Sequence, residues 1–370
     1  MTTIPLKLIA ANDTFGALVA LGDALAGTQA VFVTAPEVNG LMPEVHGLPD
    51  QVDSNIALIV ESSGSTGTPK RIYLSRDAIV ASAQASAAAL GGHGQWLLAL
   101  PINFVAGANV LIRSLAADSQ PVMMNTSLPF TAEAFARSAS LMNGARRYSS
   151  LVPAQLDRLV KAAGLDDFLV AQVAKFDAIL VGGQAASPQL VSKARALGWN
   201  IVVSYGMTET GGGCVYDGVP LPGVELRLDP NGVIEIAGAT LAQDVATDGW
   251  FHTSDLGQFS TDGQLQVLGR NDRVLISGGL KVSLDAIEAK SLELGGVVEA
   301  AALAVTDDHW GQRAALVYVG SPEVADYAAE QILDALGPAG KPVRVVRVAQ
   351  IPKLVSGKTD YLALKALLAS

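Results

Sequence analysis

The sequence predicts an α/β protein in two parts. The first is a large N-terminal domain of parallel sheets covered by helices, with a small antiparallel β unit, and the second is a smaller, mobile α+β C-terminal domain. Short apolar runs of strand length alternate with Ala-rich stretches at helical spacing, which predicts the large domain. The 370 residues fit two or three domains at roughly 150 residues each.

Predicted strands and helices alternate through the first half of the chain. Such alternation implies right-handed crossovers and a parallel sheet covered on both faces, with ligands beyond the carboxyl ends of the strands. The strands are expected at 55–60, 96–100, 121–124, 148–152, 176–181 and 200–204, and the helices at 76–90, 131–142, 153–163 and 187–197.

The pattern changes near residue 223. Short strands are then separated by Asn-Gly and Asp-Gly, which are typical of hairpin turns because they tolerate positive φ. We therefore expect a small antiparallel β unit at 223–268, inside a large domain of residues 1–270. Residues 271–370 are expected to form the mobile cap, with helices at 284–294 and 323–336, strands near 300–305, 314–319 and 343–348, and a final Leu/Ala helix.

Composition excludes several classes of protein. Half of the residues are apolar, which excludes intrinsic disorder, and the net charge of −10 argues against a nucleic-acid partner. The one cysteine, Cys214, cannot form an intrachain disulfide. With no signal-peptide pattern and no apolar run of ~20 residues, the sequence favours a cytoplasmic enzyme of small-molecule substrates, without a membrane span; a homodimer is left open.

The sharpest local signal is a hydroxyl-rich and glycine-rich segment that follows the predicted strand 55–60. Its backbone amides, hydroxyls and terminal lysine suit a polyphosphate, whereas the alternative is a Ser/Gly surface turn. It differs from the usual P-loop because no glycine precedes its lysine directly. The predicted phosphate-binding residues are Ser62, Ser63, Gly64, Ser65, Thr66, Gly67 and Lys70.

Five further segments follow the phosphate segment in a characteristic order. They are Val181-Gly-Gly-Gln-Ala185, Ser204-Tyr-Gly-Met-Thr-Glu-Thr210, Thr253-Ser-Asp-Leu-Gly257, the pair Gly269-Arg-Asn-Asp-Arg273 and Ser277-Gly-Gly-Leu-Lys281, and Ile351-Pro-Lys-Leu-Val-Ser-Gly-Lys358. Together with the phosphate segment, this ordered set resembles the adenylate-forming superfamily: acyl-CoA synthetases, adenylation domains of peptide synthetases and firefly luciferase. The resemblance runs from about residue 55 to residue 365.

The resemblance implies a role for each matched residue. Adenine and ribose would be bound by Gly182, Gly183, Gln184, Tyr205, Gly206, Asp255 and Arg270. Catalysis would fall to Lys358, Thr208 and Glu209, and Glu209 is a hard oxygen ligand of the kind that Mg²⁺ prefers. Taken singly, each has a plainer explanation: packing for Tyr205, a helix cap for Thr208 and Glu209, a turn for Asp255 and a solvated side chain for Lys358.

The resemblance also implies that residues 1–270 form an ATP- and acyl-binding domain. It places a hinge at Asp272 and a thioester-forming hairpin at Gly278, Gly279 and Lys281. A short polar stretch can absorb the φ/ψ change that a hinge requires, and an ordinary interdomain linker is the alternative. The implied cofactors and co-substrates are ATP, Mg²⁺ and coenzyme A.

Within the superfamily, the sequence resembles the short actinobacterial-type O-succinylbenzoate:CoA ligases of menaquinone biosynthesis. Only about 60 residues precede the phosphate segment, so part of the N-terminal subdomain is expected to be missing or minimal. The stretches 149–156 and 105–115 also look like that branch. Many relatives carry His where Asn103 or Phe104 stands, which puts the acyl specificity in doubt. The expected acyl-pocket residues are Asn103, Phe104, Ser150, Ser204 and Arg113, and the candidates for a second carboxylate are Arg113, Arg146 and Arg147.

The implied reaction joins a carboxylic acid to CoA at the expense of ATP, through an acyl-AMP intermediate. The alternatives are another acyl- or aryl-CoA ligase, a stand-alone amino-acid adenylating protein, and a catalytically inactive nucleotide-binding or regulatory protein. The four histidines form no pair or triad with a nucleophile, so hydrolase chemistry lacks support.

Overall fold

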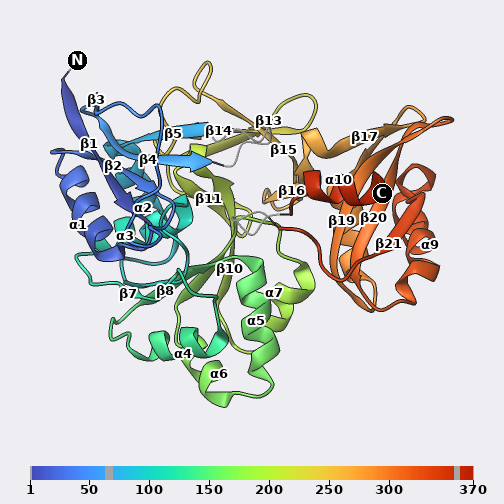
Figure 1. The fold of residues 1–370 in the computed structure, drawn as a ribbon, viewed down its shortest axis with the longest axis horizontal. Coiled ribbons are helices and arrows are strands. Elements are labelled where there is room, and N and C mark those ends of the chain that lie inside the picture. Colours follow the sequence, from blue (N-terminus) through green and yellow to red (C-terminus); the bar gives the residue numbers. More distant parts are fainter. Residues whose placement is uncertain (1, 63–69, 354–358, 370) are drawn as a thin grey trace. The chain divides into compact units, whose positions relative to one another are not determined.

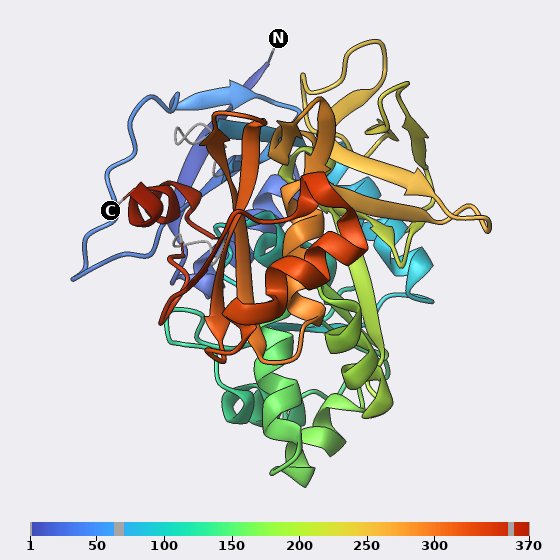
Figure 2. The same ribbon diagram turned by 90° about the vertical axis from the view of Figure 1, so that its right-hand side faces the viewer.

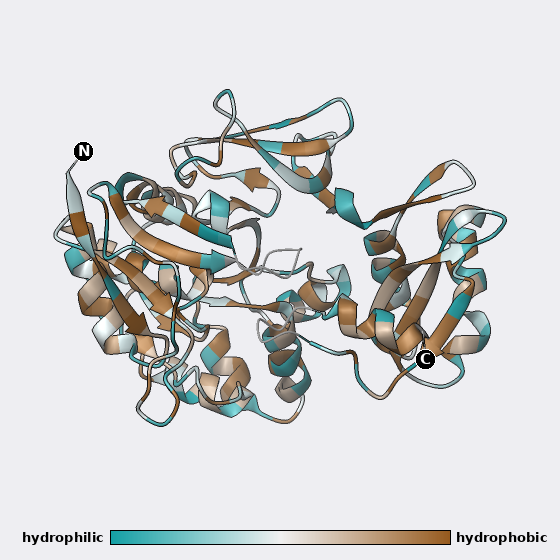
Figure 3. Ribbon diagram, turned by 45° about the horizontal axis from the view of Figure 1, so that its top comes forward, coloured by the Kyte–Doolittle hydropathy of each residue, from teal (hydrophilic) through white to brown (hydrophobic). Residues whose placement is uncertain are grey.

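The computed structural model describes residues 2–62, 70–353 and 359–369. The chain forms two compact units. The first unit comprises Met1–Leu226 and Ile236–Phe251, and the second comprises Arg227–Glu235 and His252–Ser370. Each unit has its own core, and in both the strands carry mostly hydrophobic residues (Figure 3).

The first unit contains a five-stranded sheet near the N-terminus, with strand order β3-β1-β2-β4-β5. Strands β1, β2 and β4 are parallel, while β3 and β5 run antiparallel at the two edges. The strands are β1 (Thr3–Ala10), β2 (Ala30–Thr34), β3 (Gln51–Asp53), β4 (Ile56–Ser62) and β5 (Lys70–Ser75).

The second sheet of this unit has seven strands in the order β12-β11-β10-β9-β8-β6-β7. The run from β10 to β7 is parallel, and β11 returns antiparallel to β10. The strands are β6 (Gln95–Leu98), β7 (Val122–Met123), β8 (Arg147–Leu151), β9 (Ala178–Val181), β10 (Ile201–Met207), β11 (Gly212–Tyr216) and β12 (Val219–Pro220).

Helices cover both faces of the seven-stranded sheet. One face packs against α4 to α7 through a core that includes Phe135, Leu156 and Trp199, and Figure 1 shows these helices gathered along one side of β8 and β10. Helices α2 and α3 contact the other face, and α1 and α2 contact the five-stranded sheet. The helices are α1 (Thr14–Leu25), α2 (Arg76–Ala89), α3 (Val105–Ala116), α4 (Ala132–Ser140), α5 (Pro153–Ala163), α6 (Asp167–Val173) and α7 (Pro188–Ala196).

Local sequence explains where several helices begin. Ser75, Thr131 and Ser187 each accept a hydrogen bond from the third backbone N–H that follows, which satisfies one of the unpaired amides of a helix start. Pro153 and Pro188 occupy first helical positions, where no N–H is needed. The predicted helices at 76–90, 131–142, 153–163 and 187–197 are confirmed within a few residues.

Two expectations about the sheets were incomplete. The strand predicted at 55–60 is β4, which belongs to the five-stranded sheet and not to the parallel sheet of the other predicted strands. The sequence analysis also did not predict the preceding unit of β1, α1 and β2, nor helices α3 and α6. Alternation of strands and helices predicts parallel neighbours, but it does not say where one sheet ends and the next begins.

A small antiparallel sheet of order β13-β14-β15-β16 has strands in both units, and it confirms the β elements expected at 223–268. Its strands are β13 (Val224–Leu228), β14 (Val233–Gly238), β15 (Phe251–Phe259) and β16 (Leu265–Arg270).

The second unit is built on the long antiparallel pair β19 (Val297–Asp307) and β20 (Gly311–Gly320). Figure 2 presents this unit in orange and red. Alternate residues of the pair face opposite sides: Leu316 and Tyr318 pack under α8 and α9, whereas Leu303 and Val317 pack under α10. The other elements are β17 (Val274–Ser277), β18 (Leu280–Ser283), α8 (Leu284–Glu293), α9 (Val324–Leu336), β21 (Arg344–Arg347) and α10 (Tyr361–Ala369).

These elements confirm the α+β content expected for 271–370. Among the helices in the described ranges, none is long and apolar enough to cross a membrane.

Candidate active site

Most of the predicted site residues of the first unit lie at one edge of the seven-stranded sheet. Strands β6, β8, β9 and β10 are adjacent and parallel, so their carboxyl ends meet at this edge. Ligands of parallel sheets bind there. The edge carries Asn103 and Phe104 after β6, Ser150 in β8, Gly182, Gly183 and Gln184 after β9, and Ser204, Tyr205, Gly206, Thr208 and Glu209 in or after β10.

Two glycines at this edge stand where the backbone leaves no room for a side chain. A Cβ at Gly182 would lie 2.6 Å from the Ser204 carbonyl oxygen on the neighbouring strand. A Cβ at Gly206 would lie 2.1 Å from the Gly212 carbonyl oxygen. Ordinary contacts begin at 3.4 Å, so glycine is required at both positions for close approach of the backbones.

The metal turn, as we call the short 3₁₀ turn η1 (Thr208–Thr210), carries the predicted magnesium-binding residues. Buried side chains hold it in place. Thr210 Oγ1 donates to the Gly212 carbonyl oxygen at 2.7 Å and accepts from Met207 N at 3.0 Å. The Asn109 side-chain amide of α3 donates to the Gly211 carbonyl oxygen at 2.8 Å, and Ser82 Oγ of α2 donates to the same oxygen at 3.3 Å.

Sequence analysis did not assign a role to Asn109 or Ser82. Both are polar residues on the buried faces of their helices, and such residues need a hydrogen-bond partner. A polar residue at a position where the helical spacing predicts burial is the signal that could have indicated them.

The phosphate segment joins two antiparallel strands. Ser62 at the end of β4 pairs with Lys70 at the start of β5, whereas Ser63, Gly64, Ser65, Thr66 and Gly67 lie outside the described residues. Two adjacent residues, Ala242 and Gln243, connect β5 to the metal turn. The Gln243 backbone N–H donates to the backbone carbonyl oxygen of Tyr73 in β5, and the Ala242 backbone N–H donates to that of Glu209, both at 2.8 Å. Strand β5, which begins at Lys70, and the turn that carries Glu209 are thus linked within the first unit through Ala242 and Gln243.

Arg71, next to Lys70, ties the base of the hairpin to the preceding loop. Its guanidinium donates to Glu61 Oε1 at 3.2 Å, to the Gly47 oxygen at 2.6 Å and to the His46 oxygen. No role was predicted for Arg71 from the sequence.

The candidate acyl-pocket residues divide into two groups. Asn103, Phe104, Ser150 and Ser204 share the carboxyl edge, and Asn103 Oδ1 is buried with no hydrogen-bond partner among the described residues. The structure does not bring Arg113 to this edge. Its guanidinium packs 4.9 Å from the ring of Trp96, near the amino end of β6, and donates to the Tyr216 hydroxyl at 3.3 Å.

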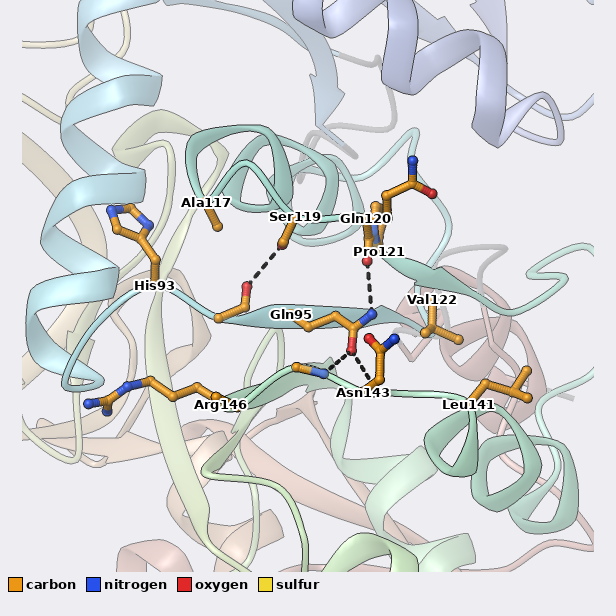
Figure 4. Close-up of a pocket in the computed structure, with 13 residues that line it drawn as sticks. His93, Gln95, Ala117, Ser119, Gln120, Pro121, Val122, Leu141, Asn143 and Arg146 are labelled. Carbon is orange, nitrogen blue, oxygen red and sulfur yellow. Dashed lines mark hydrogen bonds between the residues drawn. The ribbon is translucent and has the colours of Figure 1, made fainter.

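The two other arginines considered for a second carboxylate, Arg146 and Arg147, also lie at the amino ends of the strands. Arg146 lines an open cavity of about 750 Å³ there (Figure 4). In this cavity the Gln95 amide bonds the backbone of Asn143, Gly144 and Gln120. The Gln95 amide is therefore already hydrogen-bonded within the protein. The cavity lies at the amino ends of the strands, whereas the site candidates lie at their carboxyl ends.

The second unit brings together Asp255, Arg270 and Asp272. Asp255 of β15 pairs in register with Arg270 of β16, and their charged groups are 3.9 Å apart. Arg270 donates to both oxygens of Asp272, at 2.8 and 2.6 Å. These hydrogen bonds lower the pKa of Asp272 and raise that of Arg270. The expected ribose ligands and the expected hinge residue therefore form one charged group.

The thioester hairpin is the two-residue turn between β17 and β18. Gly278 and Gly279 have φ of +56° and +85°, as a tight hairpin turn requires. A Cβ on Gly278 would meet the ring of Trp310 at 2.3 Å, while nothing lies within 4 Å of Gly279. Lys281 is exposed, and Lys358 lies outside the described residues.

The donor set fits a nucleotide-bound magnesium ion. No group of three or more His, Cys, Asp or Glu side chains in the described ranges could hold a metal by itself. Thr208 and Glu209 supply one hydroxyl and one carboxylate, which suits a cation that takes its remaining ligands from phosphate and water.

The comparisons with known proteins agree with the fold. The chain belongs to the AMP-binding enzyme family, whose model matches residues 18–240. This confirms the resemblance to adenylate-forming enzymes.

The relatives identify a branch of this family. A Mycobacterium tuberculosis protein named "Probable 2-succinylbenzoate--CoA ligase" is 37% identical over 374 residues, covering 97% of each chain. The Escherichia coli 2-succinylbenzoate--CoA ligase is 28% identical and covers 82% of this chain and 67% of its own.

Solved structures share the fold. An E. coli MenE variant with bound OSB-AMS has a TM-score of 0.75 at 23% identity and covers 100% of this chain and 88% of its own. The Bacillus subtilis MenE complex with ATP and magnesium ion has a TM-score of 0.74 at 23% identity, with coverage of 90% and 75%.

Proposed function

We propose that this protein is an AMP-forming 2-succinylbenzoate:CoA ligase of menaquinone biosynthesis. The observation that carries the proposal is the 37% identity to the M. tuberculosis protein of that name, which extends over 97% of both chains. It is supported by the carboxyl edge of the seven-stranded sheet, where the residues expected to border adenine and to bind magnesium follow adjacent parallel strands.

The nucleotide would be held by residues of both units. In the first unit, Tyr205 would stack on adenine, the backbone at Gly182–Gln184 would border it, and the segment from Ser62 to Lys70 would bind the phosphates. In the second unit, Asp255 would accept from the ribose hydroxyls and Arg270 would add a further contact. Magnesium bound by Thr208 and Glu209 would neutralise charge on the phosphate oxygens.

The reaction has two steps. A substrate carboxylate oxygen attacks the α-phosphorus of ATP, so that the bond to pyrophosphate breaks and acyl-AMP forms; Lys358 would stabilise the charge that develops. The CoA thiolate then attacks the acyl carbonyl and AMP leaves. We propose that rotation about Asp272 removes Lys358 between the steps and presents Gly278, Gly279 and Lys281, with residues 1–270 and 271–370 as the moving parts.

The acyl group would occupy the carboxyl edge beside Asn103, Phe104, Ser150 and Ser204. Asn103 is the strongest of these candidates because its buried amide oxygen has no partner among the described residues. Oxygen and nitrogen of an amide can be exchanged by rotation, so this side chain can turn an N–H toward the second carboxylate of the substrate. Arg113 is a weaker candidate because it is packed against Trp96 at the other end of the strand.

A pyrophosphate-release assay with a panel of acids tests the proposal. We expect 2-succinylbenzoate to be preferred by at least tenfold over benzoate and a fatty acid. Preference for either of those would identify another acyl- or aryl-CoA ligase, and preference for an amino acid would identify an amino-acid adenylating enzyme. Absence of pyrophosphate release with every acid would favour the inactive nucleotide-binding protein.

Lys358→Ala tests the mechanism. It should slow adenylation by several orders of magnitude and largely spare transfer from supplied acyl-AMP to CoA. Equal effects on both steps would contradict the assigned role. A cytoplasmic location and the absence of a nucleic-acid partner are further parts of the proposal, which fractionation and a nucleic-acid binding assay can check. Light scattering can decide whether the protein is a homodimer, which the sequence leaves open.

A further inference from the structure

A half-buried group of charges in the second unit surrounds Arg273, one residue after the expected hinge. The Arg273 guanidinium donates to Asp285 Oδ1 and, at 2.5 Å, to Glu288 Oε1, both on α8. Only 14% of the Arg273 side chain is exposed. Asp285 also accepts from the backbone N–H of Arg270 at 2.6 Å, so these carboxylates hold the end of β16 and the turn after it.

The same group binds the start of the C-terminal helix. The Tyr361 hydroxyl lies 3.0 and 3.2 Å from the two oxygens of Glu288, and the Arg273 guanidinium carbon lies 3.9 Å from the centre of the Tyr361 ring. Burial and the neighbouring Glu288 raise the pKa of Tyr361, so the hydroxyl stays protonated and donates to Glu288. Glu288 also accepts from Ala302 N of β19 at 2.7 Å.

The residues on both sides of 354–358 are held to this unit. Lys353 pairs with Thr359 as an antiparallel bridge and forms an ion pair with Glu299 of β19 at 2.8 Å. Asp360 N donates to the Pro352 oxygen at 2.9 Å. Tyr361 follows directly, and Lys358 stands three residues before it.

We propose that Tyr361 and Arg273 are positioning residues that anchor the segment bearing Lys358 to the carboxylates that also hold the hinge. The proposal rests on the proposed function of Lys358 in adenylation. Asp285 and Glu288 both bond Arg273, which follows the hinge, and Glu288 also bonds Tyr361, which follows the lysine segment. The turn that carries Arg273 is thereby joined to Tyr361, the residue from which the chain leads back to the lysine segment.

The charged group around Arg273 is not needed to hold the second unit together, because the unit has apolar cores on both sides of its sheet. Leu316, Tyr318, Ile287 and Ile332 already form an apolar core under α8 and α9, and Leu364 and Leu368 hold α10 by burial. A buried ion pair is not needed for such packing, since apolar replacements are often as stable. What a hydrogen-bonded charge group adds is a defined geometry, because its bonds are lost when the partners shift.

Tyr361→Phe is the sharpest test because it removes one hydroxyl and keeps the ring over Arg273. We expect the adenylation kcat to fall about tenfold, with KM for ATP and for the acid within twofold of wild type. Transfer from supplied acyl-AMP to CoA should stay within twofold. In a Lys358→Ala background the same change should have no further effect on adenylation, because Tyr361 acts through Lys358. An equal fall in both backgrounds would overturn the proposal.

Hydrogen exchange provides a readout that needs no substrate. In Tyr361→Phe we expect faster amide exchange at Thr359 and Asp360, and unchanged exchange in β19 and β20. Unchanged exchange at Thr359 and Asp360 would overturn the proposal whatever the protein's substrate. If wild-type protein fails to adenylate any acid, the proposed function fails while this exchange result still decides the anchoring.

Tyr318→Phe is the matched control. Tyr318 is buried in the same unit and its hydroxyl donates to the carbonyls of Ser321 and Pro322, at 3.1 and 3.2 Å, with no bond to the charged group. It should leave the ratio of the two half-reactions unchanged. A selective loss of adenylation in Tyr318→Phe equal to that in Tyr361→Phe would show that general loosening of the unit explains the effect, and would refute the anchor.

Discussion

Gly206→Ala tests whether the close approach of β10 and β11 positions the metal turn. The added Cβ would lie 2.1 Å from the Gly212 carbonyl oxygen and 2.7 Å from the Gly213 Cα, and both are backbone atoms that no rotamer change can move. Reaching an ordinary contact of 3.4 Å requires the strands to part by about 1.3 Å at this point, since overpacked atoms must shift.

This shift has a cost that can be estimated from the pairs it disturbs. Gly206 pairs with Gly213, and Met207 pairs with Gly212. Overpacking of about 1–3 kcal/mol, with weakening of two backbone hydrogen bonds of about 1 kcal/mol each, predicts a loss of roughly 3 kcal/mol in the free energy of unfolding of the first unit. Thr208 and Glu209 follow directly, and a displacement of ~1 Å predicts about a hundredfold slower adenylation.

Urea denaturation and pyrophosphate release measure the two effects. Gly164→Ala is the control, because Gly164 has a helical φ of −69° and nothing within 4 Å of an added Cβ. It should stabilise by about 0.4–1 kcal/mol and leave the rate unchanged. The reasoning is refuted if Gly206→Ala keeps both the wild-type stability, to within about 0.5 kcal/mol, and the wild-type rate.

Three further predictions concern single side chains. Burial raises the pKa of the Cys214 thiol to about 11, so alkylation at pH 8 should be about 100-fold slower than for an ordinary thiol and become fast in urea, as mass spectrometry can follow. The Arg270 hydrogen bonds lower the pKa of Asp272, so its contribution to stability is present above about pH 4 and is lost as the pH falls through the lowered value. Asp272→Asn should cost up to ~1 kcal/mol at pH 7 and less at pH 2 by urea denaturation; an equal cost at both would contradict the pairing. Arg71→Met should speed limited proteolysis near Gly47, whose carbonyl it binds, and unchanged cleavage would count against this tie.

Much of the fold could be predicted from local pattern. Helices such as 153–163 could be predicted because apolar residues at helical spacing are encoded within a few positions of the sequence. The assignment of β4 to a second sheet could not be predicted from the sequence, because strand pairing depends on contacts between distant segments.

The site divides in the same way. The glycines, Tyr205 and Glu209 are marked by their motifs, whereas Asn109 and Ser82 act on Gly211 across more than a hundred residues. Arg113 illustrates the opposite error: its place in a branch-like stretch favoured an acyl contact, but its helix directs it to Trp96 and Tyr216.

The sequence by itself determined the family, the order of the motifs and the chemistry that each motif can support, because residue type and spacing along the chain carry that information. Only the tertiary structure decided which residues support the motifs. The Asn109 amide donates to the Gly211 carbonyl oxygen next to the metal turn, and Arg71 in β5 donates to the Gly47 carbonyl oxygen. Around Arg273, the bonds are made by Asp285, Glu288 and Tyr361. These are contacts between segments far apart in the chain, and they exist only once hydrophobic burial has brought the strands and helices together.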